Sequence, residues 1–118
     1  MRVLFVLTFL TALILPSGQA PASPPSDISA EVLHKQAAQG DAWAQRNLGV
    51  LYDNGRGVPQ DYVKAYMWLD LAAAQLTSNG KKLAVDNRDD TARRMTPAQI
   101  TEAQRLSQQC QARQFKGC

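Results

Sequence analysis

The chain has 118 residues, with 13 lysine or arginine residues against 10 aspartate or glutamate residues and a formal net charge of +3 at pH 7. This length allows only one small domain. Because both signs of charge are interspersed along the chain, the composition argues against a nucleic-acid-binding surface.

The amino-terminal segment has the features of a secretory signal peptide. A basic second residue precedes an apolar run over residues 3–15, and small residues follow at Ala20 and Ala22. The run has about 13 residues, which is short of the roughly 20 that cross a bilayer. We predict a signal peptide over residues 1–22, with cleavage after Ala22 preferred over Ala20. The mature protein is then periplasmic or secreted, without stable membrane insertion.

A flexible, proline-rich leader is predicted over residues 23–27, ahead of a helical domain over residues 28–118. Ser26 or Asp27 can cap the first helix, which runs to about Gln39. The glycine that follows Gln39 supplies a left-handed residue to end this helix.

Two further helices begin at aspartates that suit the N-cap position, Asp41 and Asp61. The helix after Asp41 carries an apolar stripe of Ala44, Leu48, Leu51 and Tyr52. In the helix after Asp61 the stripe of Ala65, Leu69, Ala72 and Leu76 is widened almost to a full circle by Tyr62, Tyr66, Met67, Trp68 and Leu71. A helix that is apolar nearly all round is expected to be buried between neighbours.

The carboxyl-terminal part predicts a fourth helix over residues 79–94 and a fifth after Thr96. Thr96, Pro97 and Gln99 combine an N-cap, a proline at the first helical position and a capping box. The apolar stripe of the fifth helix is Ile100, Ala103, Leu106 and Cys110. No window alternates with period two over the length of a strand, so we predict an all-α fold.

The helical pattern also repeats. The pattern Leu-x-x-x-Ala-Ala-Gln occurs at residues 33–39 and again at residues 69–75, 36 residues later. A period of this length is typical of solenoids built from helix pairs.

Gly55 and Gly57 stand between the second and third helices. A phosphate-binding loop would need a preceding strand and a following Lys-Ser or Lys-Thr pair, and neither is present. A calcium loop would need spaced carboxylates, and Lys64 stands where the closing glutamate belongs. We therefore interpret the glycines as a turn at positive φ, and we expect no metal and no other cofactor.

More than ten residues follow a defined order across the second helix, the turn and the third helix: Ala44, Gln45, Leu48, Gly49, Tyr52, Gly55, Gly57, Val58, Asp61, Tyr62, Lys64, Ala65, Trp68, Ala72 and Ala73. This order resembles the Sel-one-like repeat (SLR), a relative of the tetratricopeptide repeat. The resemblance implies a short α/α superhelix with one complete repeat over residues 41–76. It also implies a truncated repeat before the complete one and closing helices over residues 79–113.

The repeat pattern is degraded in the fourth helix. Gly80, Ala84 and Arg88 stand where alanine, leucine and tyrosine would recur, so a second complete repeat is not expected. Within the complete repeat, Gly49 should let the two helices approach closely, while Tyr52 and Trp68 fill the space between turns.

The sequence offers little for catalysis. The single histidine, His34, has no nucleophilic partner at local spacing and is expected on a helix surface or at its boundary. Asp89 and Asp90 are adjacent and point about 100° apart on a helix, so they cannot act as a carboxylate pair. We predict a monomeric, non-enzymatic protein.

The resemblance implies an adaptor that binds another protein or peptide in a groove. Some cysteine-rich exported relatives have been linked to penicillin binding and hydrolysis, so a cell-wall or β-lactam-binding protein is one alternative. A small structural or stress protein without a dedicated ligand is the other. A partner surface is predicted on the second helix at Trp43, Asn47, Val50 and Asn54, which share one face. Alternatively, Trp43 packs against the truncated repeat that precedes it.

The two cysteines of an exported chain predict one disulfide, between Cys110 and Cys118. On one continuous helix their Cα atoms would be about 12 Å apart, beyond the roughly 7 Å limit. An intrachain bridge therefore requires the helix to end near Arg113 and the tail to fold back, with Phe115 over the end of the core; the alternative is a bridge between chains. The spacing of these cysteines resembles helix-to-turn disulfides of the cysteine-rich relatives, which favours the intrachain bridge.

Overall fold

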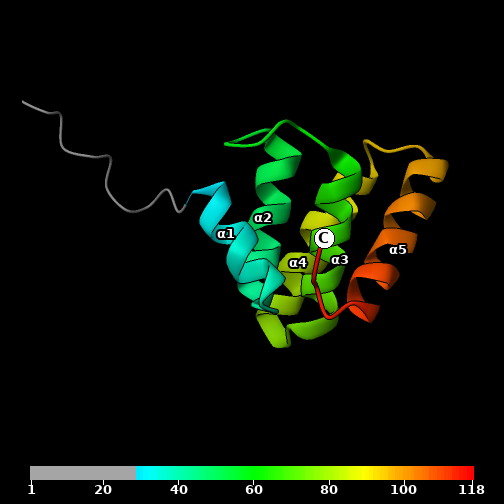
Figure 1. The fold of residues 1–118 in the computed structure, drawn as a ribbon. Helices are drawn as coiled ribbons and strands as arrows, with labels where there is room; N and C mark the ends of the chain where they lie inside the picture. Colours follow the sequence, from blue (N-terminus) through cyan, green and yellow to red (C-terminus); the bar gives the residue numbers. More distant parts are fainter. Residues whose placement is uncertain (1–28) are drawn as a thin grey trace, which may run out of the picture.

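The computed structural model describes residues 29–118, so the predicted signal peptide, its cleavage sites and the leader lie outside the described residues. Within that range the fold is all-α, as predicted (Figure 1). The helices are α1 (Ala30–Ala38), α2 (Ala42–Asn54), α3 (Tyr62–Gln75), α4 (Ser78–Ala92) and α5 (Pro97–Ala112). None of these helices has the length and apolar character needed to cross a membrane.

The helix starts follow the capping residues closely, with one correction. The Asp41 and Asp61 carboxylates accept hydrogen bonds from backbone N–H groups three residues later, at 2.9 Å and 3.0 Å. Thr96 forms the predicted reciprocal capping box. The first helix, however, is capped by Ser29, whose Oγ accepts from the Val32 N–H at 3.3 Å, and not by Ser26 or Asp27. The sequence offers several good caps in succession, and the helix uses the last of them.

The fourth helix is displaced slightly from the predicted 79–94. It begins at Ser78 and ends at Ala92, with Arg93 as its C-cap. The backbone then turns, because the Arg94 and Met95 N–H groups bond to carbonyls three residues earlier. Pro97 lacks an N–H and Thr96 caps the next helix, so the chain must leave α4 before this point.

The glycine turn between α2 and α3 is structural. Gly55 is the left-handed C-cap of α2 at φ 64°, and Gly57 has φ 73°. The turn is closed by a bond from the Asp61 N–H to the Tyr52 carbonyl at 2.9 Å. Both glycines therefore occupy conformations that other L-residues rarely adopt.

Helix α3 lies at the centre of the domain and packs against α2, α4 and α5, while α1 packs against α2 (Figure 1). Its approach to α2 depends on Gly49: a Cβ atom there would lie 2.7 Å from the Leu69 Cγ and 3.1 Å from the Ala65 carbonyl oxygen. The main core cluster is formed by Leu33, Ala37, Ala44, Leu48, Met67, Trp68, Leu71 and Cys110. A second cluster, between α3 and α4, is built on the alanines Ala72, Ala73 and Ala84.

The carboxyl-terminal tail folds back over this core. Helix α5 ends at Ala112, and Cys110 and Cys118 form a disulfide with a Cα–Cα distance of 5.8 Å. Three residues of the returning segment have positive φ, namely Gln114, Phe115 and Gly117. Phe115 packs against the main core cluster, so the tail closes one end of the domain as the sequence predicts.

Candidate partner-binding surface

Trp43 is the most exposed large aromatic side chain in residues 29–118, at 49% exposure. One edge of its indole ring is nevertheless packed: a Cβ atom at Gly80 of α4 would lie 3.0 Å from the Trp43 Cζ2. The absence of a side chain at Gly80 thus lets the ring lie directly on the backbone of α4. This contact makes α4, two helices later in the chain, a packing partner of Trp43, whereas the sequence had suggested the truncated repeat before it.

The other residues of the predicted surface differ in how far they are exposed to solvent. Asn47 and Val50 are partly buried and Asn54 is exposed at the end of α2. Asn47 Oδ1 accepts a hydrogen bond from Arg46 Nη1 at 3.1 Å, and Arg46 Nε donates to Asn87 Oδ1 on α4 at 3.0 Å. Arg46 therefore ties the two helices together beside Trp43.

Helix α4 adds an exposed apolar side chain that sequence reasoning did not assign to this surface. Leu83 is 44% exposed and lies on the same face of α4 as Gly80 and Asn87, at spacings of three and four residues. We call this surface the α2–α4 face and define it by Trp43, Asn47, Val50, Leu83 and Asn87. The 36-residue spacing was the available signal, because it relates Asn47 to Leu83.

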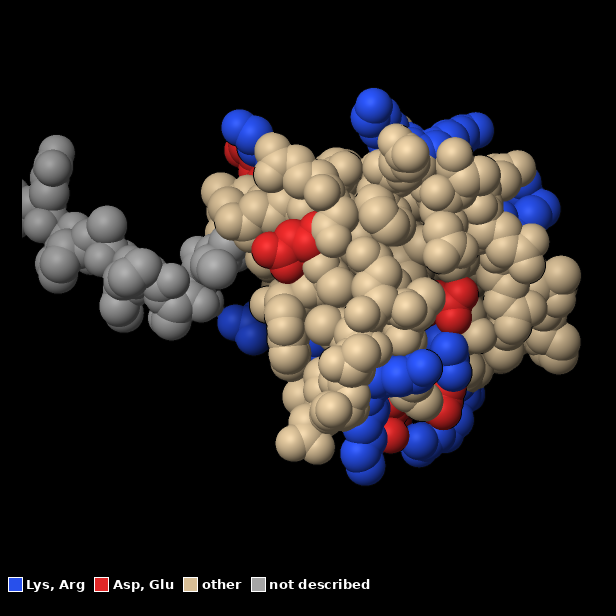
Figure 2. Space-filling model, turned by 90° about the horizontal axis from the view of Figure 1, so that it is seen from below, with Lys and Arg blue, Asp and Glu red and all other residues tan. Residues whose placement is uncertain are grey.

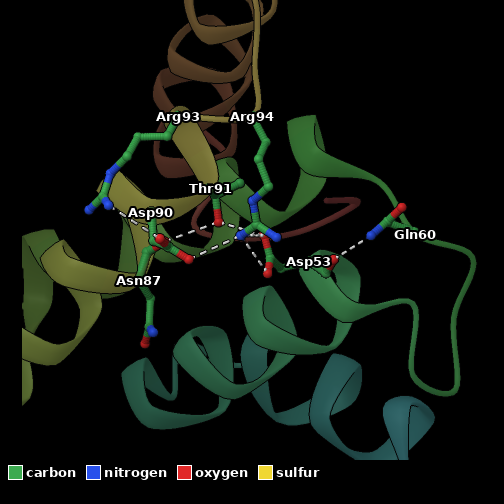
Figure 3. Close-up of polar contacts among 7 residues, drawn as sticks. All are labelled: Asp53, Gln60, Asn87, Asp90, Thr91, Arg93 and Arg94. Carbon is green, nitrogen blue, oxygen red and sulfur yellow. Dashed lines mark hydrogen bonds and ion pairs between the residues drawn. The ribbon is translucent and has the colours of Figure 1, made fainter.

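Polar contacts close the far end of the α2–α4 face (Figure 3). The Asp53 Oδ1 accepts from Thr91 Oγ1 at 2.9 Å and from Arg94 Nη2 at 2.8 Å. Burial lowers the pKa of Arg94, but the hydrogen bond and charge of Asp53 outweigh it, so this pKa is raised and the guanidinium stays charged. Arg94 also lies over the Tyr62 ring, 5.1 Å from its centre. The carboxyl ends of α2 and α4 are thus held in register.

The single histidine and the adjacent aspartates of α4 make ring or ion-pair contacts within the domain. His34 is partly buried and lies edge-on to the Trp68 ring, with 5.8 Å between ring centres. Asp89 pairs with Arg88, and Asp90 pairs with Arg93 and Arg94. Within the part of the chain that the structure describes, no three histidine, cysteine, aspartate or glutamate side chains group as metal ligands.

The residues that carried the repeat pattern lie where the two helices of the α2–α3 hairpin meet. Ala44, Leu48, Gly49, Ala65 and Trp68 are buried there, Tyr52 is partly buried, and Ala72 belongs to the cluster between α3 and α4. Residues 44–75 match the family model of the Sel1 repeat, inside the predicted repeat over residues 41–76. This part of the chain therefore matches a Sel1-like repeat (SLR). No curated protein sequence matches it significantly.

A solved structure supports the SLR assignment. The chain is similar to a protective antigen present in uropathogenic Escherichia coli strains, whose crystal structure displays an SLR fold. The two are 33% identical with a TM-score of 0.64 over 73% of this chain. The aligned part makes up only 19% of the antigen, so the comparison concerns the fold of a segment of that longer chain.

Proposed function

We propose that this SLR protein is a monomeric, non-enzymatic interaction module that acts outside the cytoplasm and binds another protein or peptide on the α2–α4 face. The observation that carries the proposal is the half-exposed Trp43 ring supported on Gly80, with the exposed Leu83 nearby on α4. Tryptophan is enriched among the residues that dominate binding energy at protein interfaces. SLR and tetratricopeptide-like folds are themselves typical interaction scaffolds.

The construction of the face suits an anchor residue. The indole ring is held on one side by the backbone of α4, so little conformational freedom remains to be lost when a partner covers the other side. Arg46 and Asp53 connect α2 to α4 on either side of Val50, which keeps the spacing of the two helices constant. A rigid, partly apolar surface with amides beside it can bury an apolar side chain and hydrogen-bond the adjoining backbone.

Two observations support a location outside the cytoplasm. The Cys110–Cys118 disulfide is a bond that persists in oxidising compartments. The amino-terminal sequence also has the basic, apolar and small-residue order of a signal peptide.

Photo-crosslinking from chosen positions tests the proposal. A photoreactive residue is placed at position 43 or 83 in the exported protein, and a control is placed at Val32. Val32 is a suitable control because it is also an exposed apolar residue, at 45%, but lies on α1. We expect the same partner from positions 43 and 83, absent from position 32, and at least about tenfold weaker binding of that purified partner to Trp43→Ala. Products that are equal from all three positions, or none from 43 and 83, would contradict the proposal.

A further inference from the structure

A hollow lies beside α4, between it and α5, away from the α2–α4 face. Helices α4 and α5 both pack against α3 but make little contact with each other, so they diverge over its carboxyl-terminal half. The space between them is a cavity of about 320 Å³ with contributions from all three helices. We call it the α3–α5 groove. Figure 2 shows the end of the molecule where α4 begins and α5 ends, with charged side chains of both signs clustered at one edge and uncharged residues over much of the rest.

One end of the α3–α5 groove is a fixed polar cluster. Asp70 accepts from Arg88 Nη1 at 2.9 Å and from Ser107 Oγ at 2.8 Å, and Ser107 is only 5% exposed. Burial lowers the pKa of Arg88, but the hydrogen bond and charge of Asp70 outweigh it, so this pKa is raised above its ordinary value. Arg88 also pairs with Asp89 at 3.3 Å, so its charge is already balanced. The Asp70 oxygens keep lone pairs that can accept further N–H donors.

The other end carries positive charge that residues 29–118 do not neutralise. Lys81 lines the groove, and no described carboxylate forms an ion pair with it. Its neighbour Lys82 differs, because it pairs with Asp86 at 2.6 Å. Lys81 and Arg88 are seven residues apart on α4, or about 10 Å along the helix axis.

The walls between these ends combine free amides with small apolar side chains. Gln108 and Gln111 lie on the same edge of α5 and line the groove; among the described residues their side chains have no hydrogen-bond partner. Each amide offers both donors and an acceptor, as a peptide bond does. The apolar lining consists of Ala73, Ala74 and Val85. With a cavity of about 320 Å³, this lining suits small side chains.

We infer that the α3–α5 groove binds the carboxyl end of a short peptide with small side chains. The terminal carboxylate pairs with Lys81, the peptide groups bond to the glutamine amides, and an N–H of the peptide donates to Asp70. A length of about 10 Å corresponds to about three extended residues. The cavity volume also falls at the small end of the roughly 300–1,000 Å³ range of small-molecule sites. This site does not depend on the α2–α4 face.

Titration with defined tripeptides, followed by amide NMR of the purified protein, tests this inference. The probe is trialanine with a free carboxylate, and the comparison ligands are trialanine amide, acetate and inorganic phosphate. We expect saturable shifts at residues of the groove, including Gln108 and Gln111, for the acid at up to about 10 mM. The amide should bind about tenfold more weakly, because it lacks the charge that Lys81 recognises.

Matched variants separate this site from general charge and from the α2–α4 face. Lys81→Gln should weaken trialanine binding about tenfold, while Lys82→Gln and Trp43→Ala should leave it unchanged. Absence of saturable shifts, equal binding of the amide, or equal effects of the two lysine variants would overturn the inference. Acetate or phosphate binding as tightly as trialanine would also overturn it, because the groove would then recognise an anion and not a peptide. Failure of the Trp43 crosslinking experiment would leave this result unaffected.

Discussion

The α2–α3 hairpin and the α4–α5 pair occupy related positions 36 residues apart, but different interactions hold them. In the hairpin, Gly49 on α2 admits Leu69 and the adjacent Trp68 fills the core. At the corresponding positions the second pair has Val85 on α4, with Arg105 and Gln104 on α5. Close apposition of α4 and α5 would therefore bury a charge and an amide, which is costly without partners.

The second pair is held to α3 by small residues and polar links instead. Ala84 packs on the alanines of α3, Arg88 pairs with Asp70, and Ser107 donates to the same carboxylate. A helix pair without the apolar signature of the repeat can thus still pack on α3 through small residues and polar links. Its helices are then free to diverge, and a groove opens between them.

The largest expected effect concerns apolar burial, which differs between α2 and α4. Leu48 on α2 is fully buried, whereas Leu83 on α4 is 44% exposed. We expect Leu48→Ala to lower the free energy of unfolding by about 3 kcal/mol, through lost burial and a residual cavity. Leu83→Ala should lower it by less than about 0.5 kcal/mol. Denaturant unfolding of the two variants measures the difference, and similar losses would mean that both helix pairs depend equally on apolar packing.

The disulfide is the covalent link between α5 and the carboxyl-terminal tail. Cys110→Ser opens the loop that joins α5 to the folded tail, and should cost about 2 kcal/mol. Cys118→Ser removes the same bond and is the matched control, so its melting temperature should fall to a similar extent. A reducing agent should abolish most of the difference between the wild type and either variant. Mass spectrometry of the unreduced protein should find no free thiols and no linked dimer as the main species.

Gly49 and Gly80 each allow a close contact between two helices, but the contacts differ in kind. A Cβ atom at Gly49 meets the buried Leu69 and backbone of α3, while one at Gly80 meets the half-exposed Trp43 ring. We expect Gly49→Ala to destabilise the protein by about 1–2 kcal/mol through overpacking. Gly80→Ala should change stability by less than about 0.5 kcal/mol, because the better helix propensity of alanine offsets the displaced indole. Thermal unfolding checks both values, and Trp43 fluorescence should change only in Gly80→Ala.

The smallest effect concerns the polar links of the second pair. Asp70→Asn removes the charge that Arg88 faces and should cost about 1 kcal/mol, since both side chains are partly exposed to solvent. Because the lost interaction is partly coulombic, the difference from the wild type should shrink at about 1 M salt. A matched control is Asp86→Asn, whose exposed pair with Lys82 should contribute much less. Equal losses in the two variants would contradict a special role for Asp70.

Much of the fold could be predicted because the relevant signals are local. Asp41, Asp61 and Thr96 each satisfy backbone N–H groups within the next turn, so they start helices regardless of the rest of the chain. The glycines between α2 and α3 mark a turn because they adopt positive φ, which is also a local property. The end of α5 was predicted because an intrachain bridge requires Cys118 to return to Cys110. The choice among the neighbouring caps before α1 was missed, because Ser26, Asp27 and Ser29 are similar in local terms, and α4 ends two residues earlier than predicted.

The tertiary structure decided what surrounds Trp43 and how α4 is used. The sequence placed Trp43 beside Asn47, Val50 and Asn54 on one helical face. It carried no local signal that Gly80 would lie beneath the indole or that Leu83 would extend the surface. Such contacts join residues far apart in the chain, and they depend on the distances between packed helices. The same reason applies to Asp70, Arg88 and Ser107, which are unremarkable in sequence and form one cluster only because α3 lies between α4 and α5.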